Sequence, residues 1–302
     1  MKNKVDFLSL VFFFISITII IPLKSFGDGD DNEIRLIVRG DDIGFCHAAN
    51  VACIKSCTEG IVRSLEVMVP CPWFTEAVEM LNNNPGIDVG IHLTVTCEWD
   101  NMKWGPVASK NEVPSLLNED GFFYQRTTQE PGYPPNVGFL EANPKPEEVE
   151  KELRAQIETA LAKIKNVTHL STHMGTATAT PELKALVEKL SREYNLPLSI
   201  PDSKRAGRWI TGATGTDAYE IEKALVEILE NLKEPGVYIL VEHPGMDIPE
   251  MRAIGHLNSR HVAQQRDAVT KAFTSEWVKD VIRTRGIKLV SYGDVIREMK
   301  NK

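Results

Sequence analysis

Short apolar runs rich in β-branched residues alternate with amphipathic stretches along most of the chain. The strand-like runs cover residues 34–40, 62–70, 87–95, 167–173, 196–200, 236–244 and 287–292. Helical patterns cover residues 46–60, 73–84, 146–165, 181–195, 218–233, 259–286 (one or two helices) and 293–300. Strands that read as continuous apolar runs are typical of a parallel sheet covered by helices. The pattern therefore predicts an α/β fold of roughly seven β/α repeats.

A closed or nearly closed (β/α) barrel fits this repeat best, and an open doubly wound sheet is the alternative. No GxGxxG follows the first run, so a Rossmann cofactor site has no support. Residues 96–145 interrupt the rhythm, and we expect them to form a loop insertion within a single domain over 28–302. The aromatic residues of this loop either stack on sugar faces or pack the loop onto the barrel: Trp99, Trp104, Phe122, Phe123, Tyr124 and Tyr133.

The first 27 residues have the three parts of a secretory signal peptide. Two lysines lie within residues 1–4, an apolar run covers 7–23, and small residues stand at Ser25 and Gly27. We therefore expect export, to the periplasm or the cell exterior, with no stable membrane insertion after cleavage. The alternative is a membrane anchor formed by uncleaved residues 5–23, because the run is at the lower limit of what spans a bilayer.

Composition narrows the class of protein without revealing its chemistry. With 42% apolar and 25% charged residues the chain is ordinary globular protein. The net charge of -8 becomes about -10 without residues 1–27, which carry three lysines and one aspartate, and an acidic chain disfavours nucleic acid as a partner. The five cysteines are expected to be small buried residues rather than a disulfide framework. A homodimer stays open as the assembly.

Polar side chains gather where the predicted strands end. Asp41 and Asp42 follow the first strand, and His92, His173 and His243 stand in or after three others. Each has an ordinary explanation: an aspartate can cap a helix, and a single histidine can be a satisfied core residue. Because the carboxyl ends of barrel strands meet at one mouth, we expect these side chains to converge. One carboxylate and two histidines suit zinc or another divalent first-row metal.

The remaining histidines lack this placement, with one partial exception. His169 lies on the same strand as His173 and is expected to point to the same face one layer lower, as a supporting residue. The histidines at 47, 256 and 261 are not expected in the site.

Four short motifs, taken in order, resemble the YdjC-like carbohydrate deacetylases, also called chitooligosaccharide deacetylases. The motifs are Arg39–Gly44 (RGDDIG), Gly90–Thr94 (GIHLT), Ser171–His173 (STH) and His243–Gly245 (HPG). The resemblance continues through residues 60–69 and 286–294 and covers essentially the whole chain after the signal.

This resemblance implies a distorted (β/α) barrel related to that of polysaccharide deacetylases. It implies a divalent metal, Mg or Zn, held by Asp42, His92 and His173, with Asp41 as general base and His243 as candidate general acid. The implied reaction is hydrolysis of the acetamido group of an N-acetylated sugar or short oligosaccharide, in which metal-bound water attacks the amide carbonyl. Such a metal lowers the pKa of its water toward about 7.

Two positions depart from the family pattern. Gly175 stands where the family commonly has a second histidine, which affects the shape of the sugar subsite. Arg39 stands where the family often has a small or polar residue; Arg39 or Arg266 is a candidate to orient Asp41. Two other functions remain open at this point: a different metallohydrolase on the same barrel, and a non-catalytic carbohydrate-binding protein.

Overall fold

A computed structural model describes residues 32–206 and 215–301, so the predicted signal peptide lies outside the described residues. The strands form one parallel sheet in the order β4-β3-β2-β1-β6-β5, and β7 pairs with β1. Their bounds are β1 Ile34–Ile43, β2 Ser64–Val67, β3 Asp88–Leu93, β4 Val167–Thr172, β5 Lys204–Arg205, β6 Gly236–Glu242 and β7 Lys288–Leu289. Within the described ranges no pairing joins β4 to β5. The sheet is therefore a curled, incompletely closed barrel, and the predicted distorted (β/α) barrel is confirmed.

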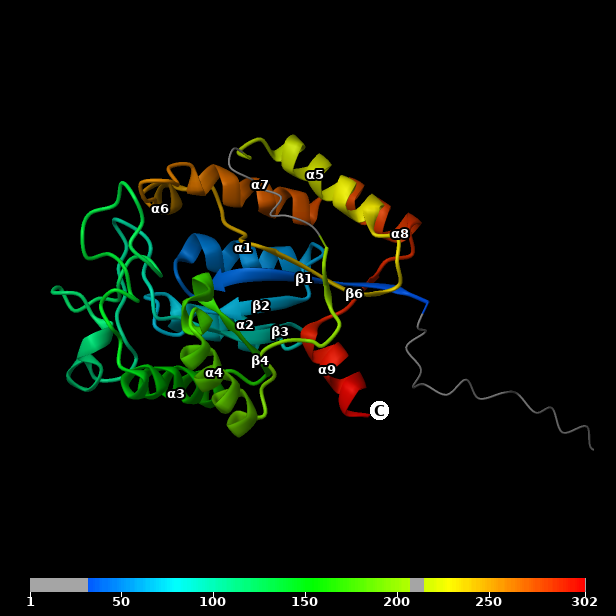
Figure 1. Cartoon of the computed structure of the whole chain (residues 1–302). Coiled ribbons are helices and arrows are strands. Elements are labelled where there is room, and N and C mark those ends of the chain that lie inside the picture. The colour runs from blue at the N-terminus through cyan, green and yellow to red at the C-terminus, as the bar shows by residue number, and fades with distance from the viewer. Residues whose placement is uncertain (1–31, 207–214, 302) are drawn as a thin grey trace, which may run out of the picture.

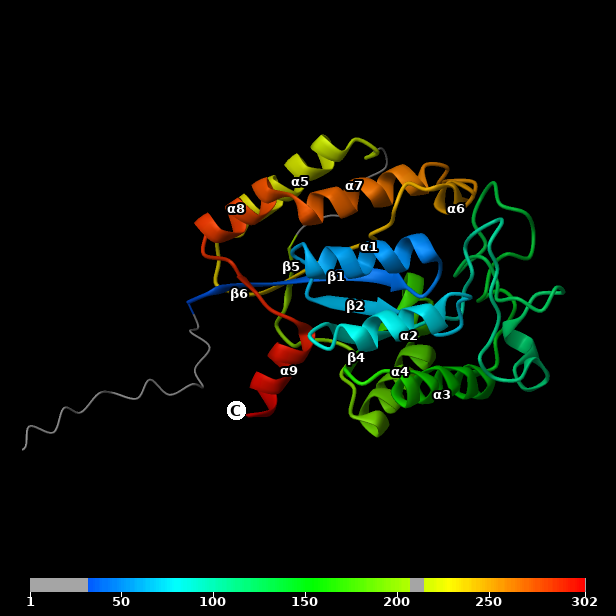
Figure 2. The same ribbon diagram turned by 180° about the vertical axis from the view of Figure 1, so that it is seen from behind.

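Helices cover the outside of this sheet. Their bounds are α1 His47–Thr58, α2 Phe74–Asn83, α3 Pro146–Lys163, α4 Pro181–Tyr194, α5 Ala218–Asn231, α6 Pro249–Arg252, α7 Val262–Thr274, α8 Glu276–Thr284 and α9 Tyr292–Lys300. Figures 1 and 2 show α5, α7 and α8 on one side, α3 and α4 on the other, and α9 away from the end at which the β1 arrow points. Across residues 32–206 and 215–301, no helix is both long and apolar enough to cross a bilayer.

The segment between β3 and α3 gathers beyond the carboxyl ends of the strands (Figure 1). Its helical content is two short 3-10 turns, η1 (Lys110–Glu112) and η2 (Pro114–Leu116). Four of the six aromatic side chains singled out in this loop are buried: Trp99, Trp104, Phe123 and Tyr133. Trp104 and Phe123 lie outside the lining of the cavity, so packing of the loop onto the barrel accounts for these two residues.

The predicted strand over 196–200 is wrong. Pro197 within this run and Pro201 after it have no N–H to donate to a ladder, so the run stays irregular. A hydrogen bond from Leu170 N–H on β4 to the Pro197 carbonyl, 2.9 Å long, connects the run to the sheet. The strand that pairs with β6 lies further along the chain, at β5.

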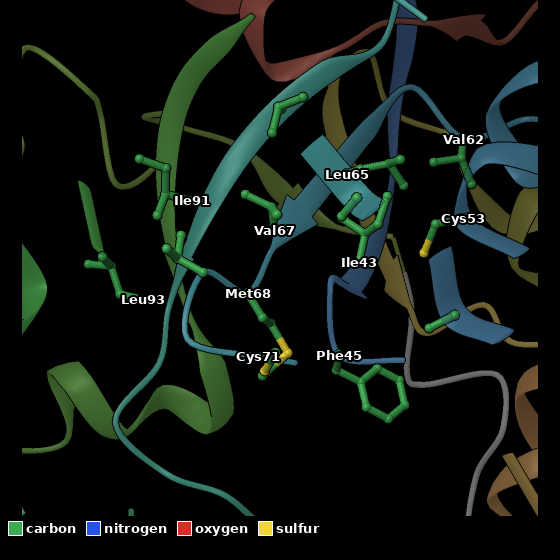
Figure 3. Packing of buried hydrophobic residues seen from close by; sticks show 14 of the residues in the cluster. Ile43, Phe45, Cys53, Val62, Leu65, Val67, Met68, Cys71, Ile91 and Leu93 are labelled. Atoms are coloured by element: carbon green, nitrogen blue, oxygen red, sulfur yellow. The ribbon is translucent and has the colours of Figure 1, made fainter. Parts of the chain in front are cut away.

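The two faces of the strands carry different side chains. Along β1, Leu36 and Val38 belong to the large core between sheet and helices, whereas Ile37 belongs to a smaller cluster that includes Val290 and Tyr292. Figure 3 shows part of the large core, where side chains from β1, β2 and β3 meet. This core stabilises the sheet from outside, so the positions that face into the barrel are free to carry polar groups.

Candidate metal and catalytic site

A β-bulge explains how two adjacent aspartates reach the same site. In β1, Gly40 pairs with Leu65 and Ile43 pairs with Val67, so three steps on β1 match two on β2. Neighbouring residues of a regular strand point to opposite faces, and an extra residue breaks that alternation. Asp42 takes up the distortion with a φ of 72°, which is unusual for a residue with a side chain. The helix-cap explanation for this pair is wrong, because Cys46 caps α1.

The sequence-predicted residues come together. Asp42, His92 and His173 each offer a ligand atom, and these atoms lie within 4.8 Å of one another. The Oδ1 atom of Asp42 is 3.7 Å from Nε2 of His92 and 3.5 Å from Nδ1 of His173. On the other side, Nε2 of His243 is 3.8 Å from Asp42 Oδ2. All of these residues and Asp41 line one cavity of about 670 Å³.

Hydrogen bonds fix which nitrogen of each histidine faces Asp42. Ser171 Oγ donates its hydrogen to Glu66, so Nδ1 of His92, 2.6 Å away, must donate to Ser171. The Nε2 lone pair of His92 then faces Asp42. Nε2 of His173 donates to the Glu98 carboxylate at 2.8 Å, so Nδ1 is the nitrogen of this ring that faces Asp42. Burial opposes protonation of His173, but Glu98 and Asp42 outweigh it and raise its pKa to about 10, so a cation at this site would replace the Nδ1 proton. Metal-binding histidines typically have such a second partner.

The two aspartates have different arginine partners. Arg39 donates to both oxygens of Asp41, at 2.7 and 2.8 Å, and so orients it. Arg266 instead donates to Asp42 Oδ2 at 2.7 Å. The other oxygen, Asp42 Oδ1, is buried without a hydrogen-bond partner. A buried carboxylate oxygen without a partner is costly, and here one nitrogen each of His92 and His173 faces it. These three donors fit a divalent cation.

The same surroundings give the two aspartates opposite pKa shifts. Burial raises the pKa of Asp41, although Arg39 and His243 oppose that rise. Burial also opposes ionisation of Asp42, but His243, Arg266 and His173 outweigh it and hold the pKa of Asp42 well below its ordinary value. Asp42 is therefore the stronger acid of the pair, and Asp41 is the one better able to accept a proton.

One histidine excluded by the sequence prediction lies at the cavity. His256 lines the wall together with Trp99, whose ring lies 5.3 Å from the imidazole at an interplanar angle of 27°. The hydroxyl of Tyr133 is 2.9 Å from His256 Nδ1. The expectation that His256 stands apart from the site is wrong, because the loop after β6 folds back over the cavity. The spacing of residues along the sequence gives no sign of this fold.

Sequence reasoning missed the two carboxylates that hold the histidines in place. Glu66 stands in a run that otherwise reads as apolar, and Glu98 stands in the loop after β3. Alternation along β2, where Ser64 and Glu66 are separated by Leu65, was the available signal for Glu66. His169 does lie one layer below the site, as expected, with Nε2 2.7 Å from Glu66 Oε1.

The fold and the site together define a parallel α/β barrel with an aspartate–histidine metal-type centre at its mouth. The chain belongs to the YdjC-like protein family, whose model matches residues 35–284.

Proteins similar to this chain include two carbohydrate deacetylases and one protein of solved structure. A carbohydrate deacetylase of Brevibacillus brevis is 29% identical over 87% of this chain and 100% of its own length. A carbohydrate deacetylase of Thermus thermophilus is 30% identical over 72% of this chain and 80% of its own length. A crystal structure of an Enterococcus faecalis protein, provisionally assigned to cellobiose-phosphate cleavage, superposes with a TM-score of 0.70 at 25% identity, covering 87% of this chain and 99% of that one.

Proposed function

We propose that this protein is a carbohydrate deacetylase that hydrolyses the acetamido group of an N-acetylated sugar or short oligosaccharide. It is a hydrolase acting on an amide bond. The observation that carries the proposal is the group of Asp42, His92 and His173 with Asp41 directly beside it. Its nearly full-length relatives named carbohydrate deacetylases support the substrate class.

The ligand set favours a nitrogen- and oxygen-binding divalent metal. Asp42, His92 and His173 would hold it, because each offers a ligand atom and these atoms lie within 4.8 Å of one another. Two imidazoles suit zinc or another first-row ion better than magnesium, which prefers oxygen ligands. When bound, the ion would polarise the amide carbonyl and acidify a water molecule.

Asp41 is the proposed general base. Its pKa is raised by burial, which suits a group that must accept a proton from the attacking water. Arg39 holds both of its oxygens, and Nε2 of His92 lies 3.8 Å from Oδ2, so the carboxylate stays beside the ligand group. Two neighbouring carboxylates with pKa values shifted apart are typical of a division of labour between ligand and base.

His243 is the proposed proton donor to the leaving amine. It stands directly after β6 on the far side of Asp42, so it reaches the substrate from another direction than Asp41. Burial, reinforced by Arg266, lowers the pKa of His243 to about 4, so the imidazole is neutral at neutral pH. It must therefore take up a proton from solvent, to which its side chain is 28% exposed, before it can donate one to the leaving amine, while the proton accepted by Asp41 returns to solvent. Asp42 Oδ2, 3.8 Å away, lies close enough to stabilise the imidazolium.

Acetate release from N-acetylglucosamine oligomers tests this function. The wild type should release acetate, and Asp41→Asn should abolish release while metal binding persists. If metal-loaded protein releases no acetate from several N-acetylated sugars, a different metallohydrolase reaction takes precedence. If Asp42→Ala and His92→Ala leave sugar binding unchanged in a protein that holds no metal, the non-catalytic alternative is correct.

We further propose that residues 1–27 direct export and are removed. The support is the order of lysines, apolar run and small residues in that segment. Mass spectrometry of the protein from its native cell tests this proposal. A mature amino terminus at position 28 supports it, whereas an intact segment in the membrane fraction favours the anchor over residues 5–23.

A further inference from the structure

A fully buried carboxylate lies directly beneath the proposed metal site. Glu66 is on β2, which pairs with β1 on one side and β3 on the other, and its side chain has no exposed surface. A buried charge is expensive unless it is paired and hydrogen-bonded. The partners of Glu66 therefore indicate what it does.

One oxygen of Glu66 determines the state of His92. Ser171 Oγ donates to Glu66 Oε2, so the serine hydrogen is committed to this carboxylate. The serine oxygen can then serve His92 Nδ1 as acceptor alone, at 2.6 Å. If the hydrogen of Ser171 were free to turn, it could donate to Nδ1 and push the imidazole proton to Nε2, where it would block a metal. Glu66, which is connected to His92 by two successive hydrogen bonds through Ser171, prevents this shift of the imidazole proton.

The other oxygen of Glu66 faces the partner of the proposed base. Oε1 lies 2.7 Å from His169 Nε2 and 3.9 Å from Arg39 Nε. Arg39 in turn holds both oxygens of Asp41. His169 stacks on Tyr292 at 4.1 Å and 12°, and the Tyr292 hydroxyl lies 3.4 Å from Arg39 Nη1. A single carboxylate is thus connected to both halves of the site.

The neighbouring strand is shaped around this carboxylate. Gly90 on β3 pairs with Glu66. A Cβ atom at Gly90 would lie 2.2 Å from Glu66 Oε2 and 2.5 Å from His169 Nε2, closer than real Cβ contacts. The space that a side chain would occupy is filled by the contact between Glu66 and His169. The absence of a side chain at Gly90 is therefore a requirement of this buried pair.

We propose that Glu66 is a positioning residue: it keeps Ser171 an acceptor for His92, and so keeps the Nε2 lone pair of His92 available to the metal. This inference rests on the proposed metal-dependent function. It assigns Glu66 no contact with substrate, because Glu66 acts through Ser171 on one side and through Arg39 on the other.

The dissociation constant of Zn²⁺, measured by competition with a chromophoric chelator, tests this proposal without reference to turnover. Glu66→Ala and Ser171→Ala should each weaken binding about 10–100-fold, the range seen when the outer partner of a metal ligand is removed. The double variant should bind no more weakly than Ser171→Ala, because Glu66 acts on the metal through Ser171.

Asp88→Asn is the matched control. Asp88 is a second buried carboxylate of the barrel interior, which accepts from Ser64 Oγ and Thr168 Oγ1, both at 2.7 Å. The variant should lower the melting temperature and leave the Zn²⁺ dissociation constant within about twofold of wild type, because Asp88 is connected to His92 through a longer chain of contacts than Glu66, by way of Thr168, His169 and Glu66 itself.

Each outcome of these binding measurements either supports or contradicts the positioning role of Glu66. If folded Glu66→Ala binds Zn²⁺ as tightly as wild type, or if Asp88→Asn weakens binding equally, the positioning role is wrong while the proposed function stands. If Glu66→Ala does not fold, Glu66→Leu, which fills more of the space and cannot accept from Ser171, decides by the same criterion. If the wild type itself binds no metal, the proposed function fails, and that result differs from either of the others.

Discussion

Arg39 donates two parallel hydrogen bonds to Asp41, from Nε to Oδ1 at 2.7 Å and from Nη2 to Oδ2 at 2.8 Å. A planar guanidinium matched to a carboxylate in this way fixes both the position and the rotation of the carboxylate. The resemblance leads us to expect a small or polar residue at this position, so the arginine calls for an explanation. Orientation of the base is the explanation that its contacts support.

Arg39→Lys should separate charge from geometry. Lysine keeps a positive charge beside Asp41 but cannot form the fork, so we expect kcat to fall about 10–100-fold with little change in KM. Steady-state acetate release measures this. Arg63→Lys is the control, because Arg63 donates to the Gly60 and Val62 carbonyls away from the site. An unchanged kcat in Arg39→Lys would contradict the orienting role.

His243→Ala distinguishes a proton donor from a metal ligand. His243 faces Asp42 from outside the three-residue ligand group, so its loss should leave metal affinity near wild type. Loss of a general acid should lower kcat by about 10²–10⁴-fold. His261→Ala, at an exposed position before α7, should change neither quantity. Metal affinity that falls together with kcat would instead make His243 a ligand.

Gly175→His tests how the missing family histidine shapes the sugar site. Gly175 has a φ of 71° and lines the cavity, and nothing lies within 4 Å of an added Cβ. The substitution should fold with a cost of about 1–2 kcal/mol for the left-handed backbone. Because the ring would reduce the room in the cavity, KM should rise more for longer oligomers than for the monosaccharide.

Gly175→Ala carries the same backbone strain without the ring and is the control for that experiment. Its KM values should stay near wild type for every substrate length. If Gly175→His changes metal affinity instead of KM, position 175 belongs to the metal site and not to the sugar site.

Stability should fall as pH rises through 7 because of Glu152 on α3. The loop backbone donates to its carboxylate from Val107 and Ala108, at 3.0 and 2.9 Å. Burial nevertheless outweighs these bonds and raises the pKa of Glu152 from 4.5 to about 7. The folded protein thus keeps a proton that the unfolded chain loses above pH 5. The resulting loss is about 3 kcal/mol in the free energy of unfolding between pH 5 and pH 9.

Urea unfolding at a series of pH values measures this contribution. Glu152→Gln should flatten the slope around pH 7, whereas Glu147→Gln on the exposed side of the same helix should keep it. If the free energy of unfolding of the wild type rises steadily from pH 6 to pH 8, and that of Glu152→Gln rises by the same amount, Glu152 does not hold a proton in the folded protein.

The sequence predicted the parts of the fold that depend on local pattern. The helix over 146–165 was predicted because Pro146 marks its start and acidic residues fill its first turn, and α3 covers Pro146–Lys163. The strand over 196–200 failed because its apolar residues suggested a strand, while its prolines removed the donors that pairing requires. The pattern of apolar residues thus locates helices and strands correctly where every residue of the run can also make the hydrogen bonds of that element.

The part of the site that depends on residue type and on position at a strand end was predictable from the sequence. Asp41, Asp42, His92, His173 and His243 converge because parallel strands end at one mouth. The bulge that brings Asp41 and Asp42 to one side depends on pairing with β2, which no local pattern contains. Glu98 and Glu66 were missed because their role is to hold other side chains, and those contacts exist in the folded chain alone.

The most direct test of the account is acetate release before and after metal removal. Protein dialysed against a chelator should release no acetate from N-acetylglucosamine oligomers, and one equivalent of Zn²⁺ or another first-row divalent ion should restore the activity. Asp42→Asn should fail to recover under the same conditions. Full activity in the metal-free protein, or recovery in Asp42→Asn equal to wild type, would contradict the assignment of Asp42, His92 and His173 as the metal site.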